Sequence, residues 1–356
     1  MSSIVLDSKK DVKLQPASEL WQKYRPENAQ YAFTAVTVEE AREWQAQASL
    51  ALASTIGVSN DEPGPMQAFL VETVEKDGYI REKLLIQTGP HTSMPLYLLL
   101  PIDAPRPLPV VIAFNGHGYG VKDIVGLWED GDEREQPEGY QKDFAVGLCK
   151  AGFAVAAPEI ACFGERQTDF SYIKTEIGQE VPSSCTHAAM LAFHLGSSVL
   201  GMRVRDGMRL IDYLETRQEL DTGRLGAMGI SGGGMHTFFS TCLDHRIKAC
   251  VVSGYYSTFQ DSILSMAHCA CNFVPGLGKF GEMYDLAGLI APRPMLVESG
   301  SRDPIFPRPA VEQSLARARV VYELLGSGEN LQADYFEGRH QVSGRMAYDF
   351  LRQALA

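Results

Sequence analysis

The chain lacks the long hydrophobic runs that membrane-spanning segments need. No apolar stretch approaches the roughly 18 residues required to cross a bilayer. The first residues, Met1 to Lys10, also lack the basic head and apolar stretch of a secretory signal peptide. We therefore expect a soluble, cytoplasmic protein with no membrane partner.

Runs of basic residues are absent too. Lys and Arg number 32 against 44 Asp and Glu, which gives a formal net charge of -12. Nucleic acids and anionic membrane surfaces attract clustered positive charge, so neither is an expected partner. The composition is compatible with a homo-oligomer.

Cysteine is scarce and irregularly spaced. An odd count without a framework favours reduced, buried thiols over disulfides. His268-Cys269-Ala270-Cys271 has metal-ligand character, but no second Cys or His pair follows at zinc spacing, so we expect no metal site. The seven cysteines are Cys149, Cys162, Cys185, Cys242, Cys250, Cys269 and Cys271.

Length and composition allow one large α/β domain with insertions or two ordinary domains. The chain has 356 residues, of which 45% are hydrophobic, enough for a full core in either case. Residues 1–65 are polar except for a helical stretch from Val38 to Ile56, whose apolar residues form an imperfect stripe. We predict that 1–65 is an N-terminal helical extension packed on a main domain, 66–356.

The pattern of the main domain predicts several strands, followed by alternating strands and helices. Strand patterns at 68–74, 80–87 and 96–100 predict an antiparallel start. The alternation that follows indicates a mostly parallel central sheet with helices on both faces, which binds ligands at the carboxyl ends of its strands. Two segments, about 158–198 and about 254–291, are too long for simple connections, and we expect lid-like insertions there.

One motif stands at a strand-to-helix junction. Gly229-Ile230-Ser231-Gly232-Gly233 matches G-x-S-x-G, follows a short apolar strand and precedes a helical stretch. Such a turn holds the serine in a strained backbone conformation, so small residues are needed two positions to either side. The motif predicts Ser231 as a nucleophile, although a glycine-rich turn holding a serine is the simpler reading of the pentapeptide alone.

A serine nucleophile needs a base and an acid that orients the base. In sheets of this kind the partners follow in the order Ser, Asp or Glu, His, each after a strand. Asp303 lies just beyond the strand at 294–297, with Glu298 as the alternative acid at the strand end. His340 follows the strand at 331–336 and is the sole histidine after both candidate acids.

The glycine-rich loop after an earlier strand predicts the oxyanion hole. One N–H comes from Gly232, the residue after the serine, and the other from the loop Asn115 to Gly120. Its His-Gly-x pattern indicates the Tyr119 N–H, with Gly118 as the alternative. A G-x-G-x-x-G match at 276–281 has no convincing strand before it, so no dinucleotide site and no cofactor is expected.

Together these residues resemble the α/β-hydrolase superfamily, in the branch of dienelactone hydrolases and acetyl xylan esterases. The resemblance runs from about Met66 to the C-terminus. Beyond the elbow it also rests on Asn115 to Gly118, Phe163 to Arg166, Ser183 to Cys185, Cys271 to Gly276, and Ile290 to Pro294 running into Asp303 to Pro307. It implies an α/β-hydrolase fold whose catalytic domain is 66–356, and a serine esterase acting on a small-molecule ester, a deacetylase or lactone hydrolase included. Dienelactone hydrolases carry a cysteine at the elbow where this chain has Ser231, which leaves the natural ester open.

Two other readings stay open. A serine peptidase or acyl-peptide hydrolase resembling the prolyl oligopeptidases shares the doubled glycine, but about 65 N-terminal residues cannot build the propeller of those enzymes. A non-catalytic α/β-hydrolase that binds a ligand has no need of the ordered Ser, Asp and His. Predicted substrate-pocket residues are His117, Glu165, Arg166, His187 and Tyr255.

Overall fold

The computed structural model describes residues 16–58, 64–171 and 182–356. The sequence pattern at Met1 to Lys10 lies outside these residues, as does the stretch 172–181 of the first long insertion. Among the helices that are described, none combines the length and the apolar character needed to span a membrane.

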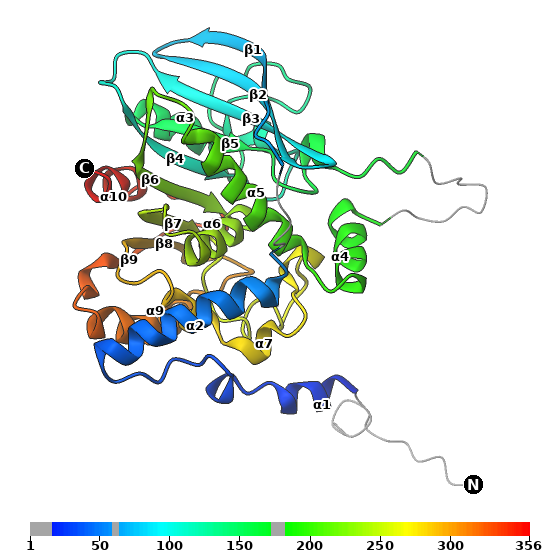
Figure 1. The fold of residues 1–356 in the computed structure, drawn as a ribbon, viewed down its shortest axis with the longest axis vertical. Helices are drawn as coiled ribbons and strands as arrows, with labels where there is room; N and C mark the ends of the chain where they lie inside the picture. The colour runs from blue at the N-terminus through cyan, green and yellow to red at the C-terminus, as the bar shows by residue number, and fades with distance from the viewer. Residues whose placement is uncertain (1–15, 59–63, 172–181) are drawn as a thin grey trace.

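In the described residues, nine strands form one sheet in the order β1-β2-β3-β5-β4-β6-β7-β8-β9 (Figure 1). β1 to β3 are antiparallel, and β3 also pairs antiparallel with β5. Along the rest of the sheet, β5-β4-β6-β7-β8-β9, each pair of neighbouring strands is parallel. This mostly parallel sheet confirms the predicted fold class. Strands β1 to β9 span Ala68–Lys76, Tyr79–Gly89, Thr92–Pro101, Leu108–Phe114, Ala154–Pro158, Leu220–Ile230, Ala249–Ser253, Met295–Gly300 and Leu331–Phe336.

Alternate residues of the central strands face two separate cores. On β4, Ile112 and Phe114 pack into one core, while Val111 and Ala113 pack into the other. The first core is covered by α2 (Val38–Ile56), α5 (Val199–Leu214), α6 (Gly232–Leu243) and α9 (Arg308–Leu324). The second is covered by α3 (Phe144–Lys150) and α10 (Ala347–Ala354), so helices lie on both faces as predicted.

The register of the parallel strands brings their carboxyl ends together. Phe114 lies opposite Gly229, and Ile230 lies opposite Ser253. Glu298 then pairs with Ser253, and Gly300 with Phe336. The loops after β4, β6, β7, β8 and β9 therefore begin side by side at one edge of the sheet.

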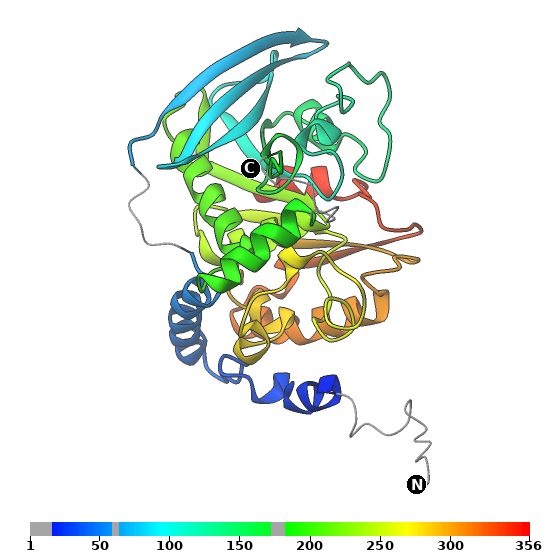
Figure 2. The same ribbon diagram turned by 90° about the vertical axis from the view of Figure 1, so that its right-hand side faces the viewer.

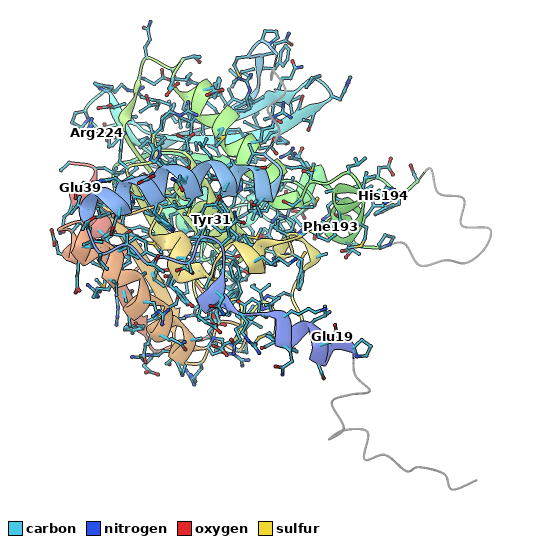
Figure 3. The ribbon with its side chains drawn as sticks, turned by 60° about the horizontal axis from the view of Figure 1, so that its bottom comes forward. Glu19, Tyr31, Glu39, Phe193, His194 and Arg224 are labelled. Atoms are coloured by element: carbon cyan, nitrogen blue, oxygen red, sulfur yellow. The ribbon has the colours of Figure 1, made fainter. Side chains whose placement is uncertain are left out.

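The helix of the N-terminal extension has the predicted bounds, Val38–Ile56, for local reasons. The Thr37 hydroxyl accepts from the Glu40 N–H while the Glu40 carboxylate accepts from the Thr37 N–H, and Gly57 ends the helix with φ of 75°. Figure 3 labels Tyr31 beside this helix, where its carbonyl accepts from the Trp44 indole at 3.1 Å. α1 (Pro16–Lys23) precedes α2 and lies outside the layers of the sheet (Figure 2).

Both long insertions contain short helices that the sequence patterns do not predict. α4 (Ser184–His194) belongs to the first insertion and stands away from the sheet, with Phe193 and His194 labelled near its end in Figure 3. The second insertion holds α7 (Leu277–Phe280) and α8 (Met283–Ala287).

Candidate active site

Ser231 occupies the sharp turn between β6 and α6. Its backbone has φ of 56° and ψ of -119°, a strained region for a residue with a side chain. The Ser231 N–H donates to the Ser253 carbonyl at 3.0 Å, which ties the turn to the neighbouring strand. Since α6 begins at Gly232, the free N–H groups of its first turn lie beside the serine.

The two outer glycines of the motif leave no room for side chains. A Cβ on Gly229 would lie 2.4 Å from the Gly233 carbonyl oxygen, and a Cβ on Gly233 would lie 1.9 Å from the Phe114 carbonyl oxygen. Both separations are far inside van der Waals contact. The turn therefore requires glycine at both positions.

A cavity of about 310 Å³ opens beside Ser231. It collects side chains from the loops after β4, β6, β7, β8 and β9, which is where the strand register brings the loops together. Its lining residues are His117, Tyr140, Ser231, Gly232, Tyr255, Ala267, His268, Cys269, Asn272, Ile305, Phe306 and His340.

His340 and Asp303 form a hydrogen-bonded pair. The distance from His340 Nδ1 to Asp303 Oδ2 is 2.8 Å. The other Asp303 oxygen accepts from the backbone N–H groups of Ile305 and Phe306 at 3.0 and 3.1 Å, which fixes the carboxylate. A carboxylate on Nδ1 leaves Nε2 as the nitrogen available to the cavity.

Two aromatic rings hold the His340 imidazole from opposite elements of the fold. Tyr140 stacks on it with centroids 5.6 Å apart, and Phe306 with centroids 5.8 Å apart. The Tyr140 hydroxyl donates to the His117 carbonyl, and burial raises its pKa above the ordinary value, so it remains a donor. The two rings and the hydrogen bond to Asp303 together hold the orientation of the imidazole.

Glu298, the alternative acid, serves a different part of the loop. It is fully buried and accepts from the Ser343 and Gly344 N–H groups at 3.0 and 2.8 Å. Burial raises the pKa of its carboxyl group. Glu298 therefore anchors the segment that follows His340 and makes no hydrogen bond to the imidazole.

The predicted oxyanion donors are only partly placed at the cavity. Gly232 lines it, but Tyr119 and Gly118 are not among its lining residues. The Tyr119 hydroxyl donates to the Leu127 carbonyl at 2.9 Å, and a Cβ on Gly118 would point toward Asp123. The residue of this loop that lines the cavity is His117.

Three predicted pocket residues lie elsewhere. His117 and Tyr255 line the cavity, whereas Glu165, Arg166 and His187 do not. Glu165 forms an ion pair with Lys83, and Arg166 forms one with Asp206. His187 packs edge-on against Phe170. The sequence does not show which predicted residues reach the cavity. Phe163 to Arg166 follows β5, which lies two strands away from β6 in the sheet.

Tyr140, His268, Asn272 and Phe306 also line the cavity. The sequence patterns do not predict them as pocket residues. Phe306 sits in the same loop as Asp303, so its proximity was available as a signal. Tyr140 has no local signal, because it reaches the cavity through long-range packing against His340. Burial lowers the pKa of His268, which favours its neutral form at the cavity wall.

Four possible metal ligands meet at the cavity wall. The donor atoms of His117, Cys185, Cys269 and Cys271 all lie within 4.8 Å of one another. We call this set the Cys3His cluster. Two of its members, His117 and Cys269, also line the cavity.

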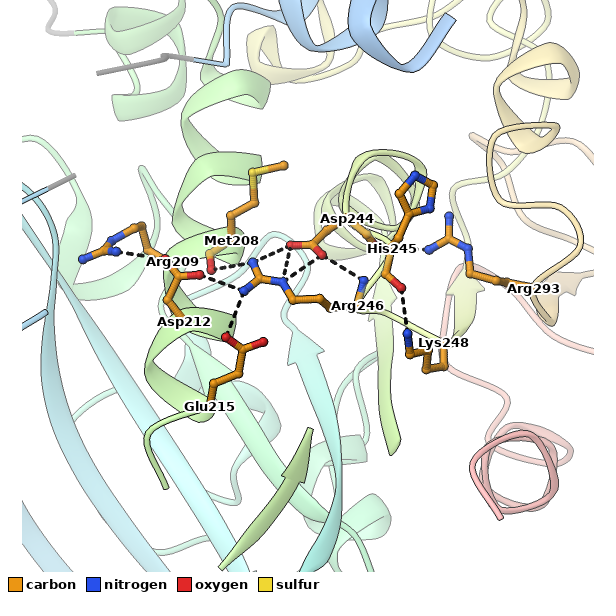
Figure 4. A network of polar contacts seen from close by, with 9 residues as sticks. All are labelled: Met208, Arg209, Asp212, Glu215, Asp244, His245, Arg246, Lys248 and Arg293. Atoms are coloured by element: carbon orange, nitrogen blue, oxygen red, sulfur yellow. Dashed lines mark hydrogen bonds and ion pairs between the residues drawn. The ribbon is translucent and has the colours of Figure 1, made fainter. Parts of the chain in front are cut away.

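The far end of α6 is held by two half-buried arginines (Figure 4). Arg293 donates to the carbonyls of Thr241, Asp244 and Ile247 at 2.6, 3.0 and 2.8 Å. Arg246 pairs with Asp244 and with Asp212 of α5, both at 2.8 Å. Arg293 thus pairs one carbonyl of the last turn of α6, that of Thr241, and two carbonyls just beyond the helix.

Comparison with known proteins places the fold. Residues 17–353 match the sequence model of the Abhydrolase family. "Putative hydrolase YtaP" of Bacillus subtilis (strain 168) is 26% identical over 274 residues, which cover 74% of this chain and 84% of that protein.

Solved structures agree. A "putative acetyl xylan esterase" from Bacteroides fragilis NCTC 9343 has a TM-score of 0.75 at 19% identity, covering 91% of this chain and 82% of that one. A glucuronoyl esterase from Solibacter usitatus has a TM-score of 0.67 at 16% identity, covering 92% and 96%. Because the fold is shared and the family match spans nearly the whole chain, this protein belongs to the Abhydrolase family, as the resemblance in its sequence predicts.

Proposed function

We propose that the protein is a serine carboxylester hydrolase. The observation that carries the proposal is the meeting of Ser231, on its strained turn, with the Asp303-bound His340 at one cavity. A strained serine at a helix N-terminus and a histidine oriented by a carboxylate are the parts that acyl transfer needs.

Ser231 attacks the ester carbonyl and His340 Nε2 takes its proton. Asp303 holds the imidazole in the correct tautomer and stabilises its charge. The Gly232 N–H binds the oxyanion. We assign the second donor to the backbone N–H of His117 in place of Tyr119 or Gly118, because His117 is the residue of that loop at the cavity. His340 then protonates the leaving alcohol, and water clears the acyl-enzyme by the same route.

The dimensions of the cavity favour a short acyl group. About 310 Å³ must hold both the acyl group and the near part of the alcohol, and the rings of Tyr255 and Phe306 are part of its lining. Structural relatives named as acetyl xylan and glucuronoyl esterases support an ester of a sugar or sugar acid. We propose acetyl or similarly small esters of carbohydrates as the substrate class.

The test combines active-site labelling with turnover. Wild type should react with a fluorophosphonate at Ser231 and hydrolyse p-nitrophenyl acetate faster than its longer-chain homologues. Ser231→Ala should lose labelling and reduce kcat by about 10³-fold or more. Ser240→Ala, a buried serine on the same helix, is the matched control and should retain both.

Full turnover by Ser231→Ala would overturn the mechanism. Turnover of peptide amides in preference to esters would favour a peptidase. A panel of acetylated sugars, glucuronate esters, lactones and aryl esters, compared by kcat/KM, would then identify the alcohol and acid preferred by the cavity.

A further inference from the structure

The four side chains of the Cys3His cluster have no part in the proposed ester hydrolysis, which uses only the backbone N–H of His117. We propose that the cluster binds one zinc ion in a closed site with four protein ligands. This goes beyond the proposed function, because the binding of a metal by these residues does not depend on Ser231. The expectation of no metal site rested on a missing second pair at zinc spacing, and the fold supplies the missing ligands from distant segments.

The donor atoms are spaced as a zinc site requires. Zn–S bonds of about 2.3 Å and Zn–N bonds of about 2.0 Å place tetrahedral ligands about 3.5 to 3.8 Å apart. Here the sulfurs of Cys269 and Cys271 are 3.2 Å apart, and Cys271 Sγ is 4.0 Å from His117 Nε2. With every pair within 4.8 Å, shifts of about 1 Å complete the tetrahedron.

The chemistry of the ligands selects zinc. Three thiolates and an imidazole are a common set for structural zinc, whereas magnesium and calcium prefer oxygen ligands. Four protein ligands leave no open position for water, so the ion is structural.

A buried arginine beside the cluster would balance the net negative charge of three thiolates and one zinc ion. Arg203 is fully buried, and among the described residues it forms no ion pair with a carboxylate. Its guanidinium donates to the Ala161 carbonyl at 2.9 Å, approaches Cys185 Sγ at 3.7 Å and lies over the Phe163 ring.

A buried cation without a counter-charge is costly. Neutral thiols at this position would leave Arg203 uncompensated. Three thiolates with Zn²⁺ carry one net negative charge, which the guanidinium offsets. The pairing of Arg203 with the cluster therefore favours a bound metal over simple packing of thiols.

The ion would join three segments that are far apart in the sequence. His117 belongs to the loop after β4, Cys185 to α4 of the first insertion, and Cys269 and Cys271 to the second insertion. One zinc would thus fix the proposed oxyanion loop to both insertions and set the wall of the cavity.

Coordination would also fix the tautomer of His117. Its Nε2 faces Cys271, while the Nδ1–Cε1 edge lies beside Gly232, where an added Cβ would sit 3.1 Å from both atoms. Zinc on Nε2 leaves the proton on Nδ1. The imidazole would then present an N–H on the Gly232 side, next to the proposed oxyanion hole.

The test measures metal in the full-length protein. Protein purified under reducing conditions, incubated with zinc sulfate and dialysed should hold about one zinc per chain by elemental analysis. Cys185→Ala and Cys271→Ala should each lose at least 90% of it, that is about tenfold in bound metal. Cys149→Ala, a buried cysteine of α3 on the other face of the sheet, is the matched control and should keep it.

Substitution of cobalt for zinc is a second test, and it uses the wild-type protein alone. Co²⁺ replacing zinc in wild type should give the intense visible bands of a tetrahedral site together with thiolate charge-transfer absorption. Wild type without zinc, zinc retained by Cys271→Ala, or weak octahedral cobalt bands would each overturn the proposal. Metal content is measured without substrate, so this outcome is separate from that of the esterase assay.

Discussion

Gly254 packs directly against the His340 imidazole. With φ of 49°, it places its α-carbon where an added Cβ would lie 3.0 Å from His340 Cε1 and 3.1 Å from Nδ1. The same Nδ1 is bonded to Asp303 at 2.8 Å, so the ring cannot retreat without breaking that bond. The geometry of the proposed base thus depends on a residue that has no side chain.

We expect Gly254→Ala to reduce kcat/KM for p-nitrophenyl acetate by about 10²-fold, because a displacement near 1 Å in a catalytic group has this effect. Gly326→Ala is the control: Gly326 also has positive φ, 69°, but its added Cβ would contact nothing within 4 Å. Backbone strain is then the same in both variants. Equal losses of activity in the two would contradict a role for Gly254 in positioning His340.

His236 is a buried histidine of α6 that forms no ion pair among the described residues. Its ring stacks on Phe114 with centroids 3.8 Å apart. Burial, with the nearby Arg203 charge, lowers the pKa of His236 well below its ordinary value. The folded protein therefore keeps this histidine neutral where the unfolded chain protonates it.

This imbalance predicts acid sensitivity of a definite sign. Below the ordinary histidine pKa of about 6.5 the unfolded chain binds a proton that the folded chain does not, so the free energy of unfolding falls as pH falls, by up to about 1.4 kcal/mol per pH unit. Urea titrations between pH 8 and 5 should show a shallower decline for His236→Phe than for wild type. His194→Phe, on the exposed end of α4, should follow wild type; identical slopes for all three proteins would refute the prediction.

At the scale of elements, α6 connects the proposed nucleophile to a half-buried arginine. Arg293 lies at its C-terminal end and donates to carbonyls of Thr241, Asp244 and Ile247. Burial lowers the pKa of Arg293, yet these acceptors hold its charge in place. The helix that begins at Gly232 is thereby fixed at its other end.

We expect Arg293→Met to lower the free energy of unfolding by about 3 kcal/mol, since it removes the donor to the carbonyls of Thr241, Asp244 and Ile247. Denaturant unfolding at constant pH measures the change. Arg352→Met is the control, because Arg352 pairs with Asp349 at an exposed site of α10 where an ion pair contributes at most about 1 kcal/mol. A loss at Arg293 no larger than that at Arg352 would show that water satisfies those carbonyls.

Elements with local signals are the ones that the sequence predicts well. Capping residues at Thr37 and Gly57 bound α2, and apolar runs bound the parallel strands. α4 is not predicted, because apolar residues such as Met190, Leu191 and Leu195 lie on its exposed side and form no core-facing stripe.

The same difference between local signals and long-range packing applies to the candidate site. The sequence predicts Ser231, Asp303 and His340 as candidates, since each follows a strand in a fixed order. Their neighbours cannot, because Tyr140 and the Cys3His cluster come together only through the packing of the insertions. Long-range contacts of this kind leave no periodic pattern in the chain.

For the whole molecule, the open question is how far the N-terminal extension belongs to the main domain. α2 places Ala48, Leu52 and Ile56 in the same buried cluster as strand residues of the sheet. Gln45 of this helix also donates to the carbonyls of Gly288 and Ala291 at 2.7 and 2.6 Å. These contacts support a proposal that residues 16–58 unfold together with the sheet as one cooperative unit.

Two leucines of α2 test that proposal, because they differ in burial and not in type. Leu52 is fully buried and Leu50 is 78% exposed. Leu52→Ala should lower the free energy of unfolding of the whole protein by about 2 to 5 kcal/mol, through lost burial and a residual cavity. Leu50→Ala should change it by no more than about 0.5 kcal/mol. Circular dichroism and tryptophan fluorescence should report one coincident transition; a separate early transition confined to the Leu52→Ala variant would mean that α2 detaches while the sheet stays folded, and the extension would then be an independent appendage.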